Sequence, residues 1–251
     1  MNRVTKPFLI QAGTVLLCMM IWEAIVESRL LFEGIVPSIF EIMKAAWLQI
    51  STGFIFPHLL VTMYEAFVGF ALAACLGIAI GIALGVEPFL RRVFEPLILY
   101  FAATPKIILY PIFLMMLGAK FESKMAMAGV SAFFPIVINA TVAAAGIDRI
   151  FIKVAKSVGA SSFQTFTRVY LPSTLLPVFT GMRLGMGAAF VGAILGELKV
   201  SNAGLGFIII QAFNHFRIPE MYASILLTFF LAASVNFAMT LMSARLRRFA
   251  Y

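Results

Sequence analysis

Long apolar segments alternate with short polar ones along the whole chain. Each apolar segment is close to the roughly 20 residues that a helix needs to cross the hydrocarbon core of a bilayer. The pattern predicts an all-α membrane protein with one transmembrane domain over residues 1–251 and six transmembrane helices. The predicted spans cover residues 8–26, 59–86, 96–118, 125–146, 173–197 and 221–242.

The first apolar segment could also be a secretory signal. Its apolar run is long for a signal, and no pair of small residues suited to cleavage follows it in residues 27–33, which read Glu-Ser-Arg-Leu-Leu-Phe-Glu. We therefore interpret it as a first span that is retained and that enters the membrane from the cytoplasm.

Glycine and proline modify two of the predicted spans. Gly77, Gly81 and Gly85 recur every four residues in the second span, which puts a groove on one helix face and lets another helix approach closely. Pro105 and Pro111 interrupt the third span and are expected to bend it.

The segments between the predicted spans differ in character. Pro37 and Ser38 open a short amphipathic helix, which we expect along the outer surface. Residues 87–95 predict a short polar hinge, and residues 119–124 predict a tight outer loop. Residues 198–220 predict a longer outer loop whose apolar part could return into the membrane.

The segment from residue 147 to residue 172 is basic and amphipathic, and its apolar residues recur at helical spacing. We expect a helix over residues 151–166. Gly159 follows the first turns of this helix, at a position suited to a bend or a C-cap. Leu171 and Pro172 are expected to close the segment before the fifth span begins.

The composition agrees with a membrane protein, since 62% of the residues are hydrophobic and 12% are charged. The net charge of +8 would suggest nucleic acid or acidic partners for a soluble protein. Here we interpret it as positive-inside bias and expect no nucleic-acid partner. Of the 19 Lys and Arg residues, eleven fall in segments predicted to be cytoplasmic and six in outer ones, which favours cytoplasmic chain termini.

The sequence gives little support for metal binding, ATP binding or catalysis. Cys18 and Cys75 lie inside apolar runs without metal spacing, and His58 and His215 are far apart at outer boundaries. The chain contains no Gly-rich phosphate loop and no HExxH or GxSxG motif, so we expect neither ATP binding by this chain, nor a cofactor, nor an enzyme.

A spaced motif runs through the basic segment, formed by Ala155, Gly159, Val169, Leu171 and Pro172. With these residues the chain resembles the membrane-spanning permease subunit of a type I ATP-binding-cassette (ABC) importer, and most of all the nitrate, sulfonate and taurine group. The five residues match positions of the family's cytoplasmic motif. Lys153 stands where the family has Glu, and Val154 stands where it has a first Ala.

Further segments are similar to the family in order and spacing. They are Val-Pro-Ser at residues 36–38, the two spaced prolines of residues 104–113, and residues 131–141, 180–185 and 196–207. One such motif would be weak evidence, whereas five in register are strong evidence.

The resemblance implies an assembly in the prokaryotic inner membrane. Two copies of the permease, expected as a homodimer surrounded by lipid, form the pathway. Two cytoplasmic ATPase subunits bind ATP and dock on the coupling helix, and an extracytoplasmic solute-binding protein delivers substrate. The residues implied in ATPase coupling are Lys153, Val154, Ala155, Ser157, Gly159, Ala160, Phe163, Leu171 and Pro172.

Four polar residues inside the spans are candidates for the translocation pathway. Lys106 could line the pathway and suit an anion such as a sulfonate, taurine, nitrate or a carboxylate, or it could extend to the membrane interface. Asn139 could line the pathway or hydrogen-bond between helices. Glu65 could pair with Lys106 or Arg183, and Glu197 could shape an outer gate or be an interfacial carboxylate.

A stand-alone secondary transporter or channel is the alternative function. It predicts inverted repeats and an intramembrane ion site. We see no clear repeat between the two halves, and this reading leaves the motif around Gly159 unexplained.

Overall fold

The computed structural model describes residues 5–28 and 34–249, so Arg3 and Arg29, which entered the charge count, lie outside the described residues. The described part is helical and contains no strand. Its elements are α1 (Thr5–Ser28), α2 (Ile39–Ser51), α3 (Ile55–Val86), α4 (Pro88–Ala103), the 3₁₀ helix η1 (Lys106–Leu109), α5 (Tyr110–Leu117), α6 (Phe121–Ala145), α7 (Arg149–Ser157), α8 (Ser162–Thr165), the π-helix η2 (Phe166–Tyr170), α9 (Leu171–Lys199), α10 (Leu205–Asn214) and α11 (Ile218–Phe249).

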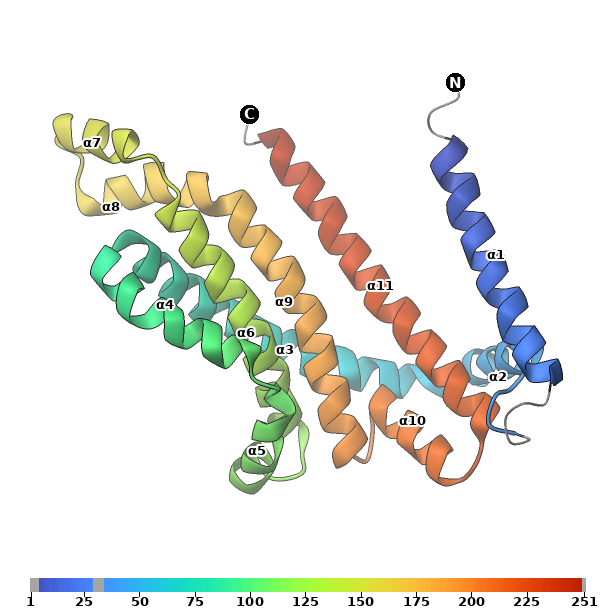
Figure 1. The fold of residues 1–251 in the computed structure, drawn as a ribbon. Helices are drawn as coiled ribbons and strands as arrows, with labels where there is room; N and C mark the ends of the chain where they lie inside the picture. The colour runs from blue at the N-terminus through green and yellow to red at the C-terminus, as the bar shows by residue number, and fades with distance from the viewer. Residues whose placement is uncertain (1–4, 29–33, 250–251) are drawn as a thin grey trace.

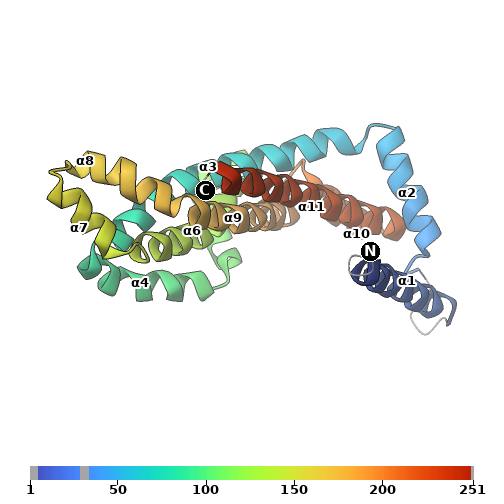
Figure 2. The same cartoon turned by 90° about the horizontal axis from the view of Figure 1, so that it is seen from above.

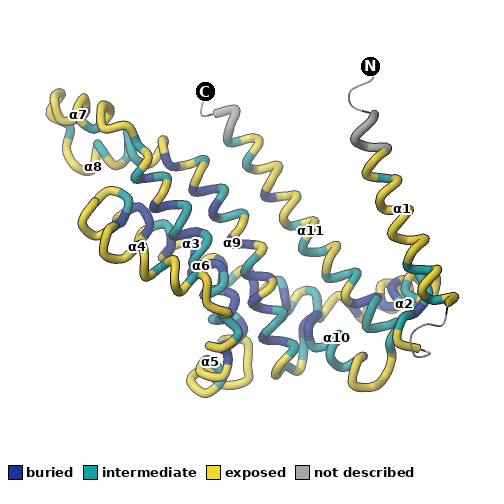
Figure 3. Tube along the Cα trace, in the orientation of Figure 1, coloured by how far each residue is buried: buried dark blue, intermediate teal, exposed yellow. Residues whose placement is uncertain are grey.

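Helices α3, α6 and α9 pack against one another and form the core (Figure 1). Their facing segments are buried, whereas α1, α4, α7 and α8 are mostly exposed (Figure 3).

The predicted glycine groove is confirmed on α3. A Cβ at Gly81 would lie 2.5 Å from the Cβ of Ala140, and one at Gly85 would lie 2.5 Å from that of Ala144. Small residues thus let α3 and α6 approach closely enough for van der Waals packing, which drives helix association in a membrane.

The helix lengths agree with the predicted fold class. Five helices of the described chain are long and apolar enough to cross a membrane, and the count becomes six if α4 and the helix formed by η1 and α5 are one span. Those two parts meet at an angle of 90°. Pro105 explains the break, because it has no N–H and disfavours helical geometry at Thr104. The predicted bend is confirmed there, while Pro111 lies in the first turn of α5, where its missing N–H costs nothing.

The predicted polar hinge at residues 87–95 is wrong, because this segment forms the first two turns of α4. Pro88 occupies the first turn, and the side chain of Glu87 accepts a hydrogen bond from the N–H of Phe89. Arg91 and Glu95 then form an ion pair of 3.3 Å one turn apart. The N-terminal cap and the ion pair therefore stabilise a helix in this segment, although its polar composition predicted a hinge.

The predicted end of the docking segment at Leu171 and Pro172 is also wrong. The helix is continuous from Ser162 through η2 and α9 to Lys199. In η2 the N–H of Leu171 bonds to the carbonyl of Phe166, five residues earlier, and Pro172 follows inside the first turn of α9. The wider π-turn accommodates a residue that has no N–H to donate.

The predicted outer loop at residues 198–220 contains the helix α10, which packs against α3, α9 and α11. The predicted loop at residues 119–124 is short, because α6 already begins at Phe121.

Helix α1 stands apart from the core (Figures 1 and 2). At its C-terminal end, Trp22 Nε1 donates to the carbonyl of Pro37 at 3.0 Å and Glu23 accepts from the N–H of Ile39 at 2.8 Å. The ring of Trp22 also meets that of Tyr222 on α11 edge to face, with ring centres 5.6 Å apart. Ser38 and Glu41 form a capping box at the start of α2. These bonds attach α1 at one end only.

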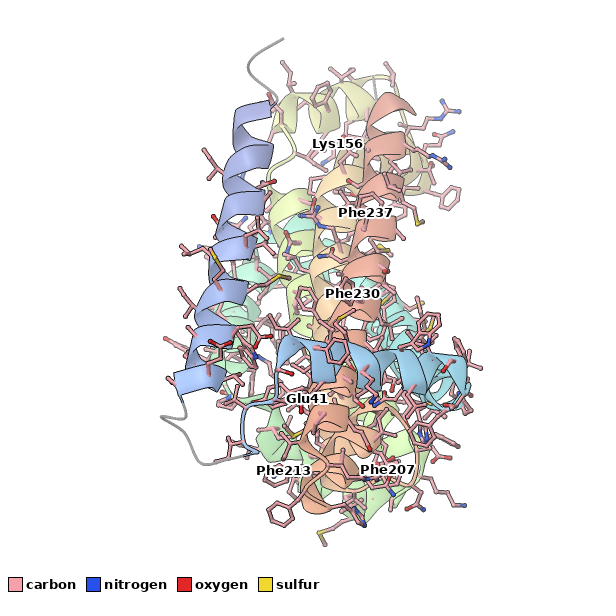
Figure 4. The ribbon with its side chains drawn as sticks, turned by 90° about the vertical axis from the view of Figure 1, so that its right-hand side faces the viewer. Glu41, Lys156, Phe207, Phe213, Phe230 and Phe237 are labelled. Atoms are coloured by element: carbon pink, nitrogen blue, oxygen red, sulfur yellow. The ribbon has the colours of Figure 1, made fainter. Side chains whose placement is uncertain are left out.

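The two ends of the bundle carry different elements. The beginning of α1, the end of α11 and the pair α7 and α8 lie at one end, and α2, α5 and α10 lie toward the other (Figure 1). In Figure 4, Lys156 lies at the first end, Phe207 and Phe213 lie at the second, and Phe230 and Phe237 project from α11 between them.

Candidate functional site

The first candidate site is the segment formed by α7 and α8. The side chain of Asp148 caps α7, accepting from the N–H of Ile150 at 2.9 Å. Helix α7 ends at Ser157, and Gly159 follows in the turn with a φ of +71°, in the left-handed region that glycine adopts without strain. The N–H of Gly159 bonds to Lys156 O and the N–H of Ala160 bonds to Ala155 O, which is the Schellman arrangement.

The predicted bend or C-cap at Gly159 is therefore confirmed, and it divides the helix predicted over residues 151–166 into two. A new helix, α8, begins after the bend, where Ser161 and Gln164 form a capping box. The segment is thus two short helices joined by a turn, and α8 continues into α9.

Helix α7 has two distinct faces. Apolar side chains on one face are exposed, including Val154 at 55% and Val158 at 75%. Phe163 on α8 is exposed at 75%. Basic side chains lie on the other face, where Arg149, Lys153 and Lys156 line a hollow of about 660 Å³ against the junction of α3 and α4. Of the residues implied in ATPase coupling, Val154 and Phe163 are thus exposed apolar groups, whereas Lys153 faces the hollow.

The remaining residues implied in ATPase coupling lie in α7, in the turn, in the hollow or in α9. Ala155 is buried, Gly159 forms the turn, and Ala160 lines the hollow. The hydroxyl of Ser157 donates to the carbonyl of Val154, and Leu171 and Pro172 belong to α9. The sequence reasoning missed Ile150 and Phe151, which are also exposed on α7, although the helical period of the segment could have indicated them.

The second candidate site is a buried polar cluster where α3, α6, α9 and α10 meet. Glu197 is 1% exposed; its Oε1 accepts from Thr62 Oγ1 at 2.6 Å and its Oε2 accepts from the N–H of Gly206 at 2.7 Å. Thr62 Oγ1 in turn accepts from the N–H of Leu205 at 2.8 Å. The first N–H groups of α10 are therefore satisfied from α3 and α9, because the N-cap residue Gly204 has no side chain.

The electrostatics of this junction favour the same arrangement. The N-terminus of a helix carries a partial positive charge, so the carboxylate of Glu197 is favourably placed there. The glycines leave room for it, since a Cβ at Gly204 would meet the carboxylate and one at Gly206 would lie 2.8 Å from Glu197 Cβ. Gly204 also has a φ of +107°, which side chains rarely adopt.

Glu65 lies next to Glu197 and is fully buried, at 0% exposure. Its two carboxylate oxygens have no hydrogen-bond donor among the described residues. Lys124, which is 2% exposed, lies near both carboxyl groups, but its Nζ donates to the carbonyls of Ala119 and Lys120 at 2.7 and 3.0 Å. Glu65 therefore meets Glu197 and Lys124 rather than the expected Lys106 or Arg183.

The other two pathway candidates lie elsewhere. Lys106 follows the bend at Pro105 and lines a hollow of about 480 Å³ between this bend, α6 and α9. Its Nζ donates to the carbonyl of Ala102 and lies 5.3 Å from the centre of the Phe134 ring. Asn139 Nδ2 donates to the carbonyl of Pro135 at 2.8 Å within its own helix. The structure thus brings Glu65 and Glu197 together and keeps Lys106 and Asn139 apart from them.

The chain is similar in sequence to known proteins. Residues 73–249 match the family described as "Binding-protein-dependent transport system inner membrane component". The putative aliphatic sulfonates transport permease protein of Bacillus subtilis is 28% identical over 207 residues, which cover 82% of this chain and 75% of that protein. The formylaminopyrimidine transport permease protein of Halalkalibacterium halodurans is 30% identical, covering 84% of this chain and 83% of that one.

A solved structure has the same fold. A chain of the MetNI methionine ABC transporter, in an inward-facing conformation, superimposes with a TM-score of 0.66. The superposition covers 83% of this chain and 97% of the other at 18% sequence identity. At this identity the likeness bears on the fold alone.

Proposed function

Because the chain belongs to the family of binding-protein-dependent transport system inner membrane components, and so is a permease subunit of an ABC importer in the inner membrane, we propose that it takes up a small organic or inorganic anion. Two copies of the chain form the pathway. Cytoplasmic ATPase subunits drive it through α7 and α8, and a solute-binding protein delivers substrate at the end that carries α2 and α10. Helices α7 and α8 are then cytoplasmic, as are the beginning of α1 and the end of α11.

The observation that carries the coupling role is the exposed apolar face of α7 and α8. This segment lies beyond the ends of α3 and α6, yet it presents Val154, Val158 and Phe163 outward. Burying one such side chain fully in a partner contributes roughly 1.5–3 kcal/mol. A partner that covers this face would therefore gain substantial binding energy from a few residues, which is the usual distribution in protein interfaces.

Co-purification with the ATPase tests this role. We expect Val154→Asp and Phe163→Asp to lose the ATPase, because each would bury an unpaired charge in the interface. Lys156→Gln, on the basic face of α7, is the matched control and should retain the ATPase. An ATPase that binds equally to all three variants would contradict the proposal, and transport by the purified chain without ATP would indicate the secondary transporter.

The anion preference is supported by Lys106. Its ammonium group lies in a hollow at the bend between α4 and α5, and no carboxylate pairs with it among the described residues. Ser131 lines the same hollow with a hydroxyl group. The relative that carries aliphatic sulfonates in its name supports the same class of substrate. An unpaired cation in a span is favourable only where it meets water or a counter-charge, and an anionic substrate supplies one.

Uptake measurements with two variants test the preference. We expect Lys106→Ala to lower the uptake of an alkanesulfonate by tenfold or more, because the counter-charge is lost, and Lys106→Arg to retain most of it. Lys120→Ala, which removes an exposed lysine at the start of α6, is the control. Undiminished uptake by Lys106→Ala would count against a role of this lysine in the pathway.

The homodimer is supported by the isolation of α1. This helix is long and apolar enough to span a membrane, but the core of its own chain does not cover it. Cross-linking of a full importer in the membrane would test the pairing, with permease dimers expected as the product.

A further inference from the structure

The hollow behind α7 has the composition of an anion site. Three cations line it, Arg149, Lys153 and Lys156, all from one face of α7. Hydroxyl groups of Ser162, Thr165 and Tyr170 line it from the other side of the turn. No carboxylate among the described residues lines it, and the nearest acidic group along the chain, Asp148, is engaged in capping α7.

Within the part of the chain that the structure describes, the cations in this hollow form no ion pair. The ion pairs found among the described residues, Arg91 with Glu95 and Arg217 with Glu220, lie elsewhere. Arg149 and Lys153 are four residues apart on the helix, a spacing at which like charges repel each other. The three charges therefore favour binding of an anion, which would offset the repulsion.

A second, apolar hollow continues from the first. It has a volume of about 610 Å³ and follows one face of α3 from Cys75 to Val86. Val86 and Phe166 line both hollows. At 1.5 Å per residue, this stretch of α3 is roughly 16 Å long, about half the thickness of the hydrocarbon core. The basic hollow thus lies at the end of a membrane-spanning helix, and an apolar groove extends from it along that helix.

We propose that the two hollows together bind one anionic phospholipid of the surrounding membrane. Its phosphate lies among Arg149, Lys153 and Lys156, and one acyl chain follows α3 between Cys75 and Val86. Basic pockets between helices at the membrane surface suit anionic headgroups, because the charges and the acyl chain are both satisfied there. A free phosphate would use only the first hollow and would leave the groove without a function.

The position of the site separates it from the proposed ATPase contact. The lipid occupies the basic face of α7 and the ATPase contacts the apolar face. The site rests on the membrane location of the chain and not on its substrate. A lipid held there would connect α7 to α3 and thus the α7–α8 pair to the core of the bundle.

Native mass spectrometry of the full chain in detergent tests the proposal, with added phosphatidylglycerol as the anionic lipid and phosphatidylcholine as the zwitterionic one. We expect the triple variant Arg149→Gln, Lys153→Gln, Lys156→Gln to bind phosphatidylglycerol at least tenfold more weakly. The matched control removes the same charge at exposed lysines of the other end, in Lys44→Gln, Lys120→Gln, Lys199→Gln, and should bind as wild type. Equal binding by the two triple variants overturns the proposal.

A substitution in the groove distinguishes a lipid from a free anion. Ala79→Phe would fill the apolar hollow and leave every charge in place, so phosphatidylglycerol should bind several-fold more weakly while binding of inorganic phosphate stays the same. Leu72→Phe is the control, at an exposed position of α3 outside the groove. Inorganic phosphate that displaces the lipid at equal concentration would show a free-anion site and overturn the lipid assignment. Thermal unfolding of the basic triple variant at the temperature of the wild type shows that the chain is folded. Lipid binding is measured without the ATPase, which keeps this test separate from that of the importer function.

Discussion

Two helix starts in this molecule satisfy the same physical requirement in opposite ways. Helix α8 is capped by its own neighbours in the chain, since Ser161 and Gln164 bond to each other's backbone N–H groups. Helix α10 is capped by side chains from far along the chain, since Glu197 and Thr62 accept from its first N–H groups. The first start is exposed and the second is buried. A local cap keeps a surface segment regular, whereas a cap from distant residues joins helices together.

The comparison predicts that substitution at the buried cap has the larger effect. Glu197→Ala leaves the N–H of Gly206 without its acceptor in a buried site, removes the shorter bond of Thr62 and opens a cavity, so we expect a loss of about 3–5 kcal/mol in the free energy of unfolding. Glu197→Gln keeps one acceptor oxygen and should lose about half as much. Thermal unfolding of the detergent-solubilised chain measures both, and a shift within error for Glu197→Ala would show that the cluster does not hold α10.

Substitutions at two glycines, Gly206 at the start of α10 and Gly159 before α8, extend the comparison of the two helix starts. A Cβ at Gly206 would lie 2.6 Å from the carbonyl oxygen of Ile194, so Gly206→Ala should cost about 2 kcal/mol through overpacking. At Gly159 no atom lies within 4 Å of such a Cβ, so Gly159→Ala should cost only about 1 kcal/mol for the positive φ. The same unfolding experiment ranks the two variants, and the reverse order would contradict the close contact between α9 and α10.

Substitutions of Glu65 test how hydrogen-bond donors and acceptors are balanced in the buried polar cluster. Both of its oxygens lack a donor, and its neighbour Glu197 already accepts from two groups. The amide of Glu65→Gln can donate to Glu197, so we expect this variant to be as stable as wild type or more stable by about 1 kcal/mol. Glu65→Ala is the comparison that leaves a cavity, and it should be less stable than Glu65→Gln. Equal loss of stability in both variants would show that the carboxylate itself is required.

Ser161→Ala should have the most local effect. It removes one exposed cap, at a cost of about 1 kcal/mol that is confined to α8. Hydrogen exchange should therefore increase in residues 162–165 and stay unchanged in α10. Thr165→Ala, which removes a neighbouring hydroxyl outside the capping box, is the control. Faster exchange throughout the bundle would contradict the local character of this cap.

The long helices were the predictable part of the fold. Apolar segments of membrane-spanning length indicated α3, α6, α9 and α11, because the length of such a segment depends only on the thickness of the bilayer. The glycine spacing on α3 indicated its close contact, and Pro105 indicated the bend. The errors fell at residues 87–95 and at Pro172, where local capping and a π-turn extended helices that composition alone would have ended.

The candidate sites were predictable to different degrees. The turn at Gly159 and the amphipathic character of α7 could be predicted from the chain, since both arise from neighbours in the sequence. The sequence did not indicate which face of α7 lies against the bundle, so Lys153 and Val154 entered one set although they lie on opposite faces. That distinction depends on where α3 and α4 meet.

By itself the sequence determined the membrane-spanning helical class, the family and the places where helices bend. These follow from hydropathy, from glycine and proline geometry, and from motifs that lie within short stretches of chain. Only the tertiary structure decided that Glu197, which lies 135 residues from its partner Thr62 in the sequence, would hold the start of α10. A buried polar group must find its partner in space, and helix packing sets which groups meet.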